Sequence, residues 1–175
     1  VGQCTVETLG NIFAAPSRQA SSNYGVGKDG KIGLYVEEKD RSWCSGGYDV
    51  NGNPIRVNGI SGADNDQRAI TIEVASDTTD PYTITDEAYE GLIRLLVDIC
   101  KRNPGIGRLR WQGDKSLVGQ TDRQNMTVHR WFARKACPGD YLYARHTAIA
   151  AEVNRRLDRE EEKEDNTVKE WWEEP

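Results

Sequence analysis

Residues 69–75 (AITIEVA) limit most strongly what this chain can fold into. The stretch is rich in β-branched residues and has the length of a strand, which predicts a strand buried within a sheet. One acid, Glu73, interrupts the apolar run. Because a buried charge is costly unless it is paired or performs chemistry, Glu73 is the first candidate functional residue.

Further strand and helix signals surround this stretch. Residues 23–36 alternate apolar and polar side chains around an Asp-Gly pair, a pattern typical of a β-hairpin. Residues 5–15, 86–102 and 140–157 show helical periodicity, and residues 109–111 are expected to form a short strand. The glycine-rich residues 45–65 predict a long loop with room for a small hairpin. Together these signals predict an α/β fold: one domain with a central mixed β-sheet flanked by α-helices.

The charge of the chain is concentrated at its C-terminal end. Of a net charge of −5 over 175 residues, residues 158–175 carry nine acids against three bases, which leaves residues 1–157 close to neutral. We therefore expect one folded domain at residues 1–157 and an acidic helix extension or linker at residues 158–175. The body has no basic stripe of a nucleic-acid binder. No apolar run is long enough to span a membrane, and no signal peptide is visible.

Residues 125–142 (NMTVHRWFARKACPGDYL) contain His129, Lys135 and Cys137. An imidazole and a thiol separated by a turn can share a zinc ion. They can also form a nucleophilic Cys/His pair, or be an unrelated buried histidine and core cysteine. The spacing alone leaves all three interpretations open.

These residues resemble the C-terminal zinc motif of the N-acetylmuramoyl-L-alanine amidases, a family that includes the peptidoglycan-recognition proteins. Residues 21–43 (SSNYGVGKDGKIGLYVEEKDRSW) and residues 69–75 resemble two further family segments in the same order. The resemblance implies that His129 and Cys137 bind Zn²⁺, that Lys135 stabilises the oxyanion, and that Glu73 lies near the metal. It also implies hydrolysis of the amide between N-acetylmuramic acid and L-alanine of peptidoglycan.

Three positions depart from the family pattern. The first zinc ligand of the family is a histidine at the end of the first strand, a place that falls upstream of Val1, so we expect the first strand and a third ligand there. A tyrosine that assists catalysis in some members aligns with Ser22, which makes Glu73 the general base. A histidine often found after the tryptophan of the hairpin segment is Cys44 here.

The resemblance extends to substrate and setting. Asn23 and Trp43 are expected to line the substrate groove, although Trp43 also suits a core position. The chain resembles clostridial or prophage endolysins, and this resemblance implies a protein that is made in the cytoplasm, released without a signal peptide and active at the cell wall. The resemblance makes residues 1–157 the zinc amidase catalytic domain and allows a cell-wall-binding domain beyond Pro175. Two alternatives stay open: a non-catalytic peptidoglycan-binding module of the same fold, and a Cys/His hydrolase.

Overall fold

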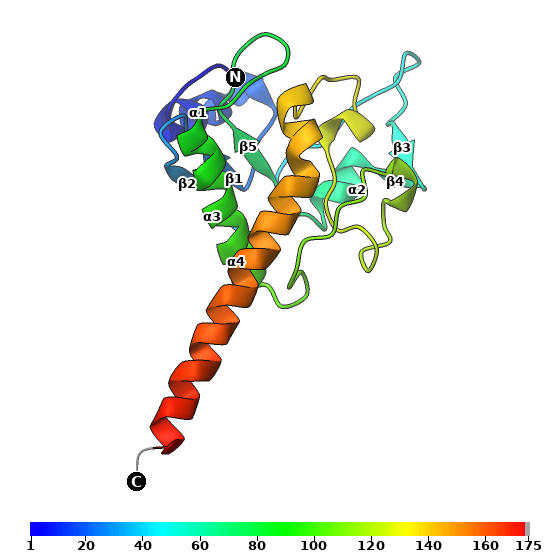
Figure 1. Cartoon of the computed structure of the whole chain (residues 1–175). Helices are drawn as coiled ribbons and strands as arrows, with labels where there is room; N and C mark the ends of the chain where they lie inside the picture. The colour runs from blue at the N-terminus through cyan, green and yellow to red at the C-terminus, as the bar shows by residue number, and fades with distance from the viewer. Residues whose placement is uncertain (174–175) are drawn as a thin grey trace.

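A computed structural model describes the backbone of residues 1–173 and the side chains of residues 1–161. Its main sheet has the strand order β2-β1-β5. Strand β1 (Tyr24–Val26) pairs antiparallel with β2 (Ile32–Leu34) and parallel with β5 (Ile72–Val74). Helices lie against this sheet (Figure 1). The predicted α/β fold with a mixed sheet is confirmed.

The predicted hairpin joins β1 to β2 through a tight turn. The backbone N–H of Gly27 donates to the carbonyl of Lys31 at 2.9 Å. Gly30 has a φ of +73°, and a Cβ at this position would lie 2.4 Å from the carbonyl oxygen of Glu87. Only glycine fits both the left-handed backbone and this close approach to the next helix.

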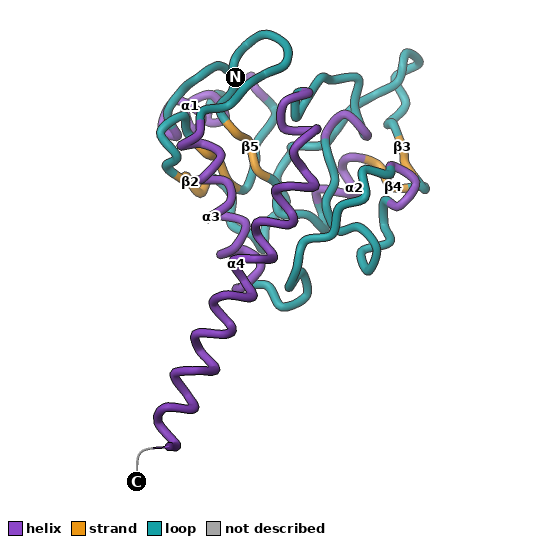
Figure 2. Tube along the Cα trace, in the orientation of Figure 1, coloured by secondary structure: helices purple, strands orange, loops and turns teal. Residues whose placement is uncertain are grey.

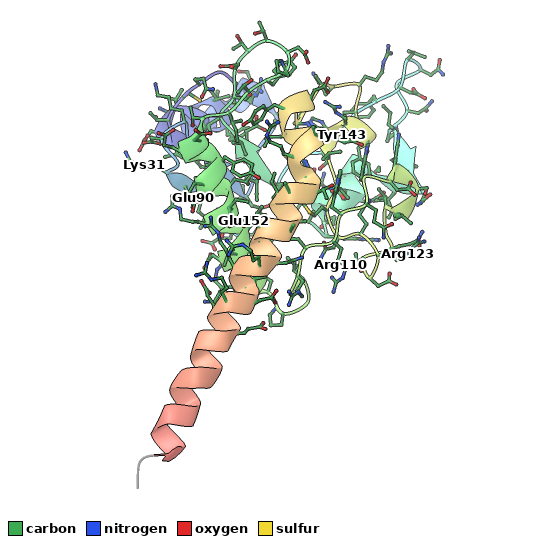
Figure 3. All side chains as sticks on the ribbon, viewed as in Figure 1. Lys31, Glu90, Arg110, Arg123, Tyr143 and Glu152 are labelled. Atoms are coloured by element: carbon green, nitrogen blue, oxygen red, sulfur yellow. The ribbon has the colours of Figure 1, made fainter. Side chains whose placement is uncertain are left out.

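Three helices accompany the sheet: α1 (Val6–Ala14), α3 (Asp86–Arg102) and α4 (Asp140–Glu173). Thr85 caps α3, because its hydroxyl accepts the N–H of Ala88 at 3.0 Å. Helices α3 and α4 pack on each other, and the guanidinium of Arg156 joins Glu90 of α3 to Glu152 of α4 (Figure 3). The apolar stripe predicted for α4 is buried at Leu142, Ile149, Val153 and Leu157.

The other side of the molecule consists largely of loops (Figure 2). It contains a small hairpin of β3 (Arg56–Val57) and β4 (Ile60–Ser61), the helix α2 (Gly62–Asp66), and the 3-10 helices η2 (Lys115–Leu117) and η3 (His129–Trp131). A further 3-10 turn, η1 (Pro16–Arg18), follows α1. This side has its own core of five buried residues: Val57, Val118, Val128, Trp131 and Phe132.

The prediction of a short strand at residues 109–111 is wrong. The N–H and the carbonyl of Leu109 pair with the side-chain amide of Asn154 on α4, both at 2.9 Å. In the same way, the side-chain amide of Asn125 accepts from the N–H of Arg110 and donates to the carbonyl of Arg108. Side-chain amides therefore take the place of a partner strand, and no strand among the described residues pairs with this extended segment.

Helix α4 passes Leu157 without a break and continues to Glu173. The acidic segment expected at residues 158–175 is thus helical as far as its backbone is described, while its side chains from residue 162 onward lie outside the described residues. The division at residue 157 stays a prediction. Within the described part, none of the helices combines the length and apolarity needed to cross a membrane.

Candidate active site

Glu73 is the central residue of β5 and lies opposite Gly25 of β1 in the parallel register. Its side chain is partly buried, and burial raises the pKa of its carboxyl group, while the amino group of Val1 and the guanidinium of Arg18 lower it. Among the described residues, no hydrogen bond engages this carboxylate. A carboxylate with a raised pKa and free lone pairs is suited to accept and return a proton.

Three thiols share the neighbourhood of Glu73. Burial raises the pKa of Cys4, Cys44 and Cys137, and the negative charge of Glu73 raises each pKa further. For Cys137 the pKa reaches about 12.

His129 begins η3, and its Nε2 lies 3.4 Å from the carbonyl oxygen of Gly46. A carbonyl only accepts, so Nε2 must carry the hydrogen in this contact, which leaves Nδ1 with a free lone pair. Burial lowers the pKa of His129, and the nearby charge of Lys135 lowers it further, against opposing effects of Gly46 and Asp66. The structure therefore favours neutral His129, the form that ligates metals.

Arg130 ties the His129 end of the segment to the Cys137 end. Its backbone N–H donates to the carbonyl of Cys137 at 3.0 Å. Its guanidinium donates to the carbonyl of Ala136 and to the carboxylate of Asp140, and it stacks 4.7 Å from the ring centre of Tyr143. The predicted pair of His129 and Cys137 is thus joined through its neighbours, and Lys135 is exposed between them.

The donor set for a metal is incomplete in the described residues. His129 and Cys137 offer the nitrogen and sulfur ligands that zinc prefers, and a catalytic zinc site needs three protein ligands. No group of three or more His, Cys, Asp or Glu side chains within residues 1–161 is arranged to hold a metal ion. Two residues fit zinc by type, but the described chain alone does not assemble a site.

Asn23 occupies a structural position. It is 1% exposed, and its amide nitrogen donates to the carbonyls of Val36, Glu37 and Asp40 at 3.1–3.2 Å. Its amide oxygen accepts from the N–H and the hydroxyl of Thr71. These bonds fasten the segment after β2 to the start of β5, and contact of Asn23 with a substrate stays a prediction.

Trp43 lies on the surface, with 58% of its area exposed. The guanidinium carbon of Arg41 lies 5.5 Å from the centre of its ring. The alternative of a core position for Trp43 is therefore excluded, and the side chain is available to a ligand.

Asp66, at the end of α2, was not anticipated as part of the site. It is 4% exposed, and its carboxylate accepts the N–H groups of Cys44 and Ser45 at 3.0–3.1 Å. This bond pair fixes the loop whose Gly46 carbonyl faces His129. A signal for α2 exists in the sequence, because Ser61 and Asp64 form a capping box with reciprocal hydrogen bonds.

A carboxylate without a hydrogen-bond partner, a neutral imidazole, a thiol and an exposed lysine are groups that hydrolases use, and this α/β scaffold carries them at Glu73, His129, Cys137 and Lys135. A model of the N-acetylmuramoyl-L-alanine amidase family matches residues 3–140, which span Glu73, His129 and Cys137. The chain belongs to this family, whose members are amidases acting on peptidoglycan. Comparisons with curated proteins and with solved structures gave no match.

Proposed function

We propose that this protein hydrolyses the amide bond between the lactyl group of N-acetylmuramic acid and the L-alanine of the peptidoglycan stem peptide. The observation that carries the proposal is the partly buried carboxylate of Glu73, held in the middle of the edge strand β5 without a hydrogen-bond partner among the described residues. Membership in the amidase family supports the choice of substrate.

Glu73 is the proposed general base. It accepts a proton from the attacking water, whose oxygen forms the new bond to the carbonyl carbon. The same proton then passes to the nitrogen of L-alanine as the amide bond breaks, leaving a carboxylate on the lactyl group and a free amino terminus. Lys135 would donate to the oxyanion of the tetrahedral intermediate, a role in which losing one donor typically costs about 10²–10³ in rate.

Zinc is part of the proposal, with Nδ1 of His129 and the thiolate of Cys137 as ligands. A zinc ion there would act as a Lewis acid on the scissile carbonyl. The third ligand, a histidine, is proposed to come from residues preceding Val1.

Metal analysis of purified variants tests the zinc assignment. His129→Ala and Cys137→Ala should each lose zinc and wall hydrolysis together, and a chelator should inactivate the unsubstituted protein. Cys100→Ala is the matched control, because Cys100 is buried among α3 residues and should leave zinc content unchanged. Full activity in either ligand variant would contradict the assignment.

The other two interpretations predict different behaviour. A Cys/His hydrolase needs a thiolate near neutral pH, and a pKa of about 12 for Cys137 gives it no support. A non-catalytic module would bind cell walls without releasing new amino termini. The proposed amidase acts at the bacterial cell wall as a lytic enzyme of the endolysin type.

A further inference from the structure

The residues between Trp43 and β3 include a hairpin, residues 47–55, that is rooted beside His129. Gly46, just before it, directs its carbonyl at Nε2 of His129. Gly47 approaches the next loop so closely that a Cβ there would lie 2.4 Å from the side chain of Ala133. The root of the hairpin is therefore fixed relative to the candidate active site.

The hairpin is ordered up to its tip. The N–H of Ile55 donates to the carbonyl of Gly47 at 3.0 Å, and Tyr48 forms an antiparallel bridge with Pro54. At the tip, the carboxylate of Asp49 accepts the N–H groups of Asn51 and Asn53 at 2.8 and 2.9 Å. A ligand that binds here does not have to order the loop first, which favours affinity.

This ordered hairpin projects from the body as the cyan loop that leads into β3 (Figure 1). Tyr48 is 65% exposed and Val50 is 78% exposed. Together with Trp43, they are more exposed than any other large apolar side chain in the described part of the chain. Exposed apolar side chains gathered in one segment beside a catalytic site indicate a contact surface for a ligand.

The substrate has two parts, a glycan strand and a stem peptide, on either side of the scissile bond. The charge near the hairpin indicates which of the two parts would bind there. The carboxylate of Asp49 is engaged in its own turn, and Arg56 at the base is paired with Asp64 at 3.0 Å, so the face that carries Tyr48 offers little free charge. A stem peptide carries carboxylates and suits the cation of Arg41 beside Trp43. A sugar chain is a largely neutral polyol with apolar C–H faces, which suits an exposed aromatic ring.

We propose that the 47–55 hairpin is the glycan subsite of the enzyme, with the ring of Tyr48 as a platform on which one sugar of the glycan strand stacks. The choice of ligand rests on the proposed function, because the bond to be cleaved joins a sugar to a peptide. Tyr48 binds substrate in this role and takes no part in the chemical step.

Binding of two separate probes to the full chain tests the proposal. The probes are peptide-free glycan strands and free stem peptide, each titrated into the unsubstituted protein, Tyr48→Ala and Tyr48→Phe. Tyr48→Ala should weaken glycan binding by about 2- to 10-fold, while Tyr48→Phe keeps it and stem-peptide binding does not change. Leu34→Ala, which removes an exposed apolar side chain on β2, is the control and should bind both probes normally.

Three results would overturn the subsite: no binding of glycan strands, equal glycan affinity of Tyr48→Ala and the unsubstituted protein, or a matching loss of stem-peptide binding. An unchanged Tm for Tyr48→Ala ensures that the comparison reports on binding. Release of amino termini from whole walls is measured separately. If the protein releases amino termini but Tyr48→Ala binds glycan normally, only the subsite is disproved. If glycan binding depends on Tyr48 but no amino termini are released, only the proposed hydrolysis is disproved.

Discussion

The side chain of Glu73 is placed at a cost to stability. A strand of Ile, Val and Thr would bury an apolar residue at this position, whereas this sheet holds a carboxylate whose pKa is raised by burial. A group whose charged form is disfavoured in the folded state destabilises the fold when it ionises. Such a cost in the middle of β5 is typical of a residue kept for chemistry.

Replacing Glu73 by glutamine should therefore change stability and activity in opposite directions. Because the folded pKa lies above the unfolded value of about 4.3, the stability contributed by Glu73 is full below that value and is lost as pH rises through the folded pKa. Glu73→Gln should melt about 2–4 °C higher than the unsubstituted protein at pH 7 and equally at pH 4, while hydrolysis falls about 10²–10⁴-fold.

Melting curves at the two pH values check this, with Glu161→Gln as the control, because Glu161 is exposed on α4. The control should show the same Tm as the unsubstituted protein at both pH values. A Tm difference for Glu73→Gln that does not depend on pH would show that ionisation of Glu73 costs nothing.

A second prediction at the residue scale concerns Arg130. Its guanidinium holds the carbonyl of Ala136 and the carboxylate of Asp140, and its side chain is 24% exposed. Arg130→Gln should lower the free energy of unfolding by about 1–3 kcal/mol, because charged hydrogen bonds are lost. Asp140→Asn removes only the exposed ion pair and should cost about 0–1 kcal/mol. Equal losses in chemical denaturation would mean that Arg130 does not fasten the turn before Cys137.

At the scale of elements, sequence patterns correctly predicted those helices and turns that are stabilised by interactions between residues close together in the chain. The Asp29-Gly30 turn and the apolar stripes of α3 and α4 are encoded within a few residues of each other, and the structure confirms them. The strand expected at residues 109–111 failed because its partner is a side chain 45 residues away, Asn154. No short-range pattern announces such a bond.

The same distinction between short-range and long-range contacts applies to the candidate site. The alternating and β-branched patterns placed Glu73 on a strand, and the structure puts it at the centre of β5. The approach of Gly46 to His129, and the anchoring of that loop by Asp66, depend on contacts across 83 and 21 or 22 residues of chain. The roles of Glu73, Lys135, His129 and Cys137 rest on the family resemblance and remain predictions.

At the scale of the whole molecule, α4 belongs to the body although the family match ends where the helix begins. Residues 140–157 bury Ile149, Val153 and Leu157 against α3 and the sheet. Beyond them the described contacts are surface ion pairs, Arg108 with Asp158 and Lys101 with Glu160. Among the side chains that the structure describes on α4, Leu157 is the last buried one, and the boundary at residue 157 stays a prediction.

Truncation tests this boundary. A chain that ends at residue 157 should unfold cooperatively and within a few degrees of the full chain, because exposed ion pairs contribute about 0–1 kcal/mol each. A chain that ends at residue 140 loses five buried apolar side chains (Leu142, Ile149, Ala150, Val153 and Leu157) and should show no cooperative transition by calorimetry. A large loss of Tm in the longer truncation would place the domain boundary further along α4.

The most direct test of the account is the identity of the bond that is cleaved. Purified peptidoglycan is incubated with the protein, and the new end groups are determined chemically. The account predicts that new amino termini are L-alanine alone, that no new reducing sugar ends appear, and that Glu73→Gln abolishes the release. New reducing ends, amino termini other than L-alanine, or full release by Glu73→Gln would contradict it.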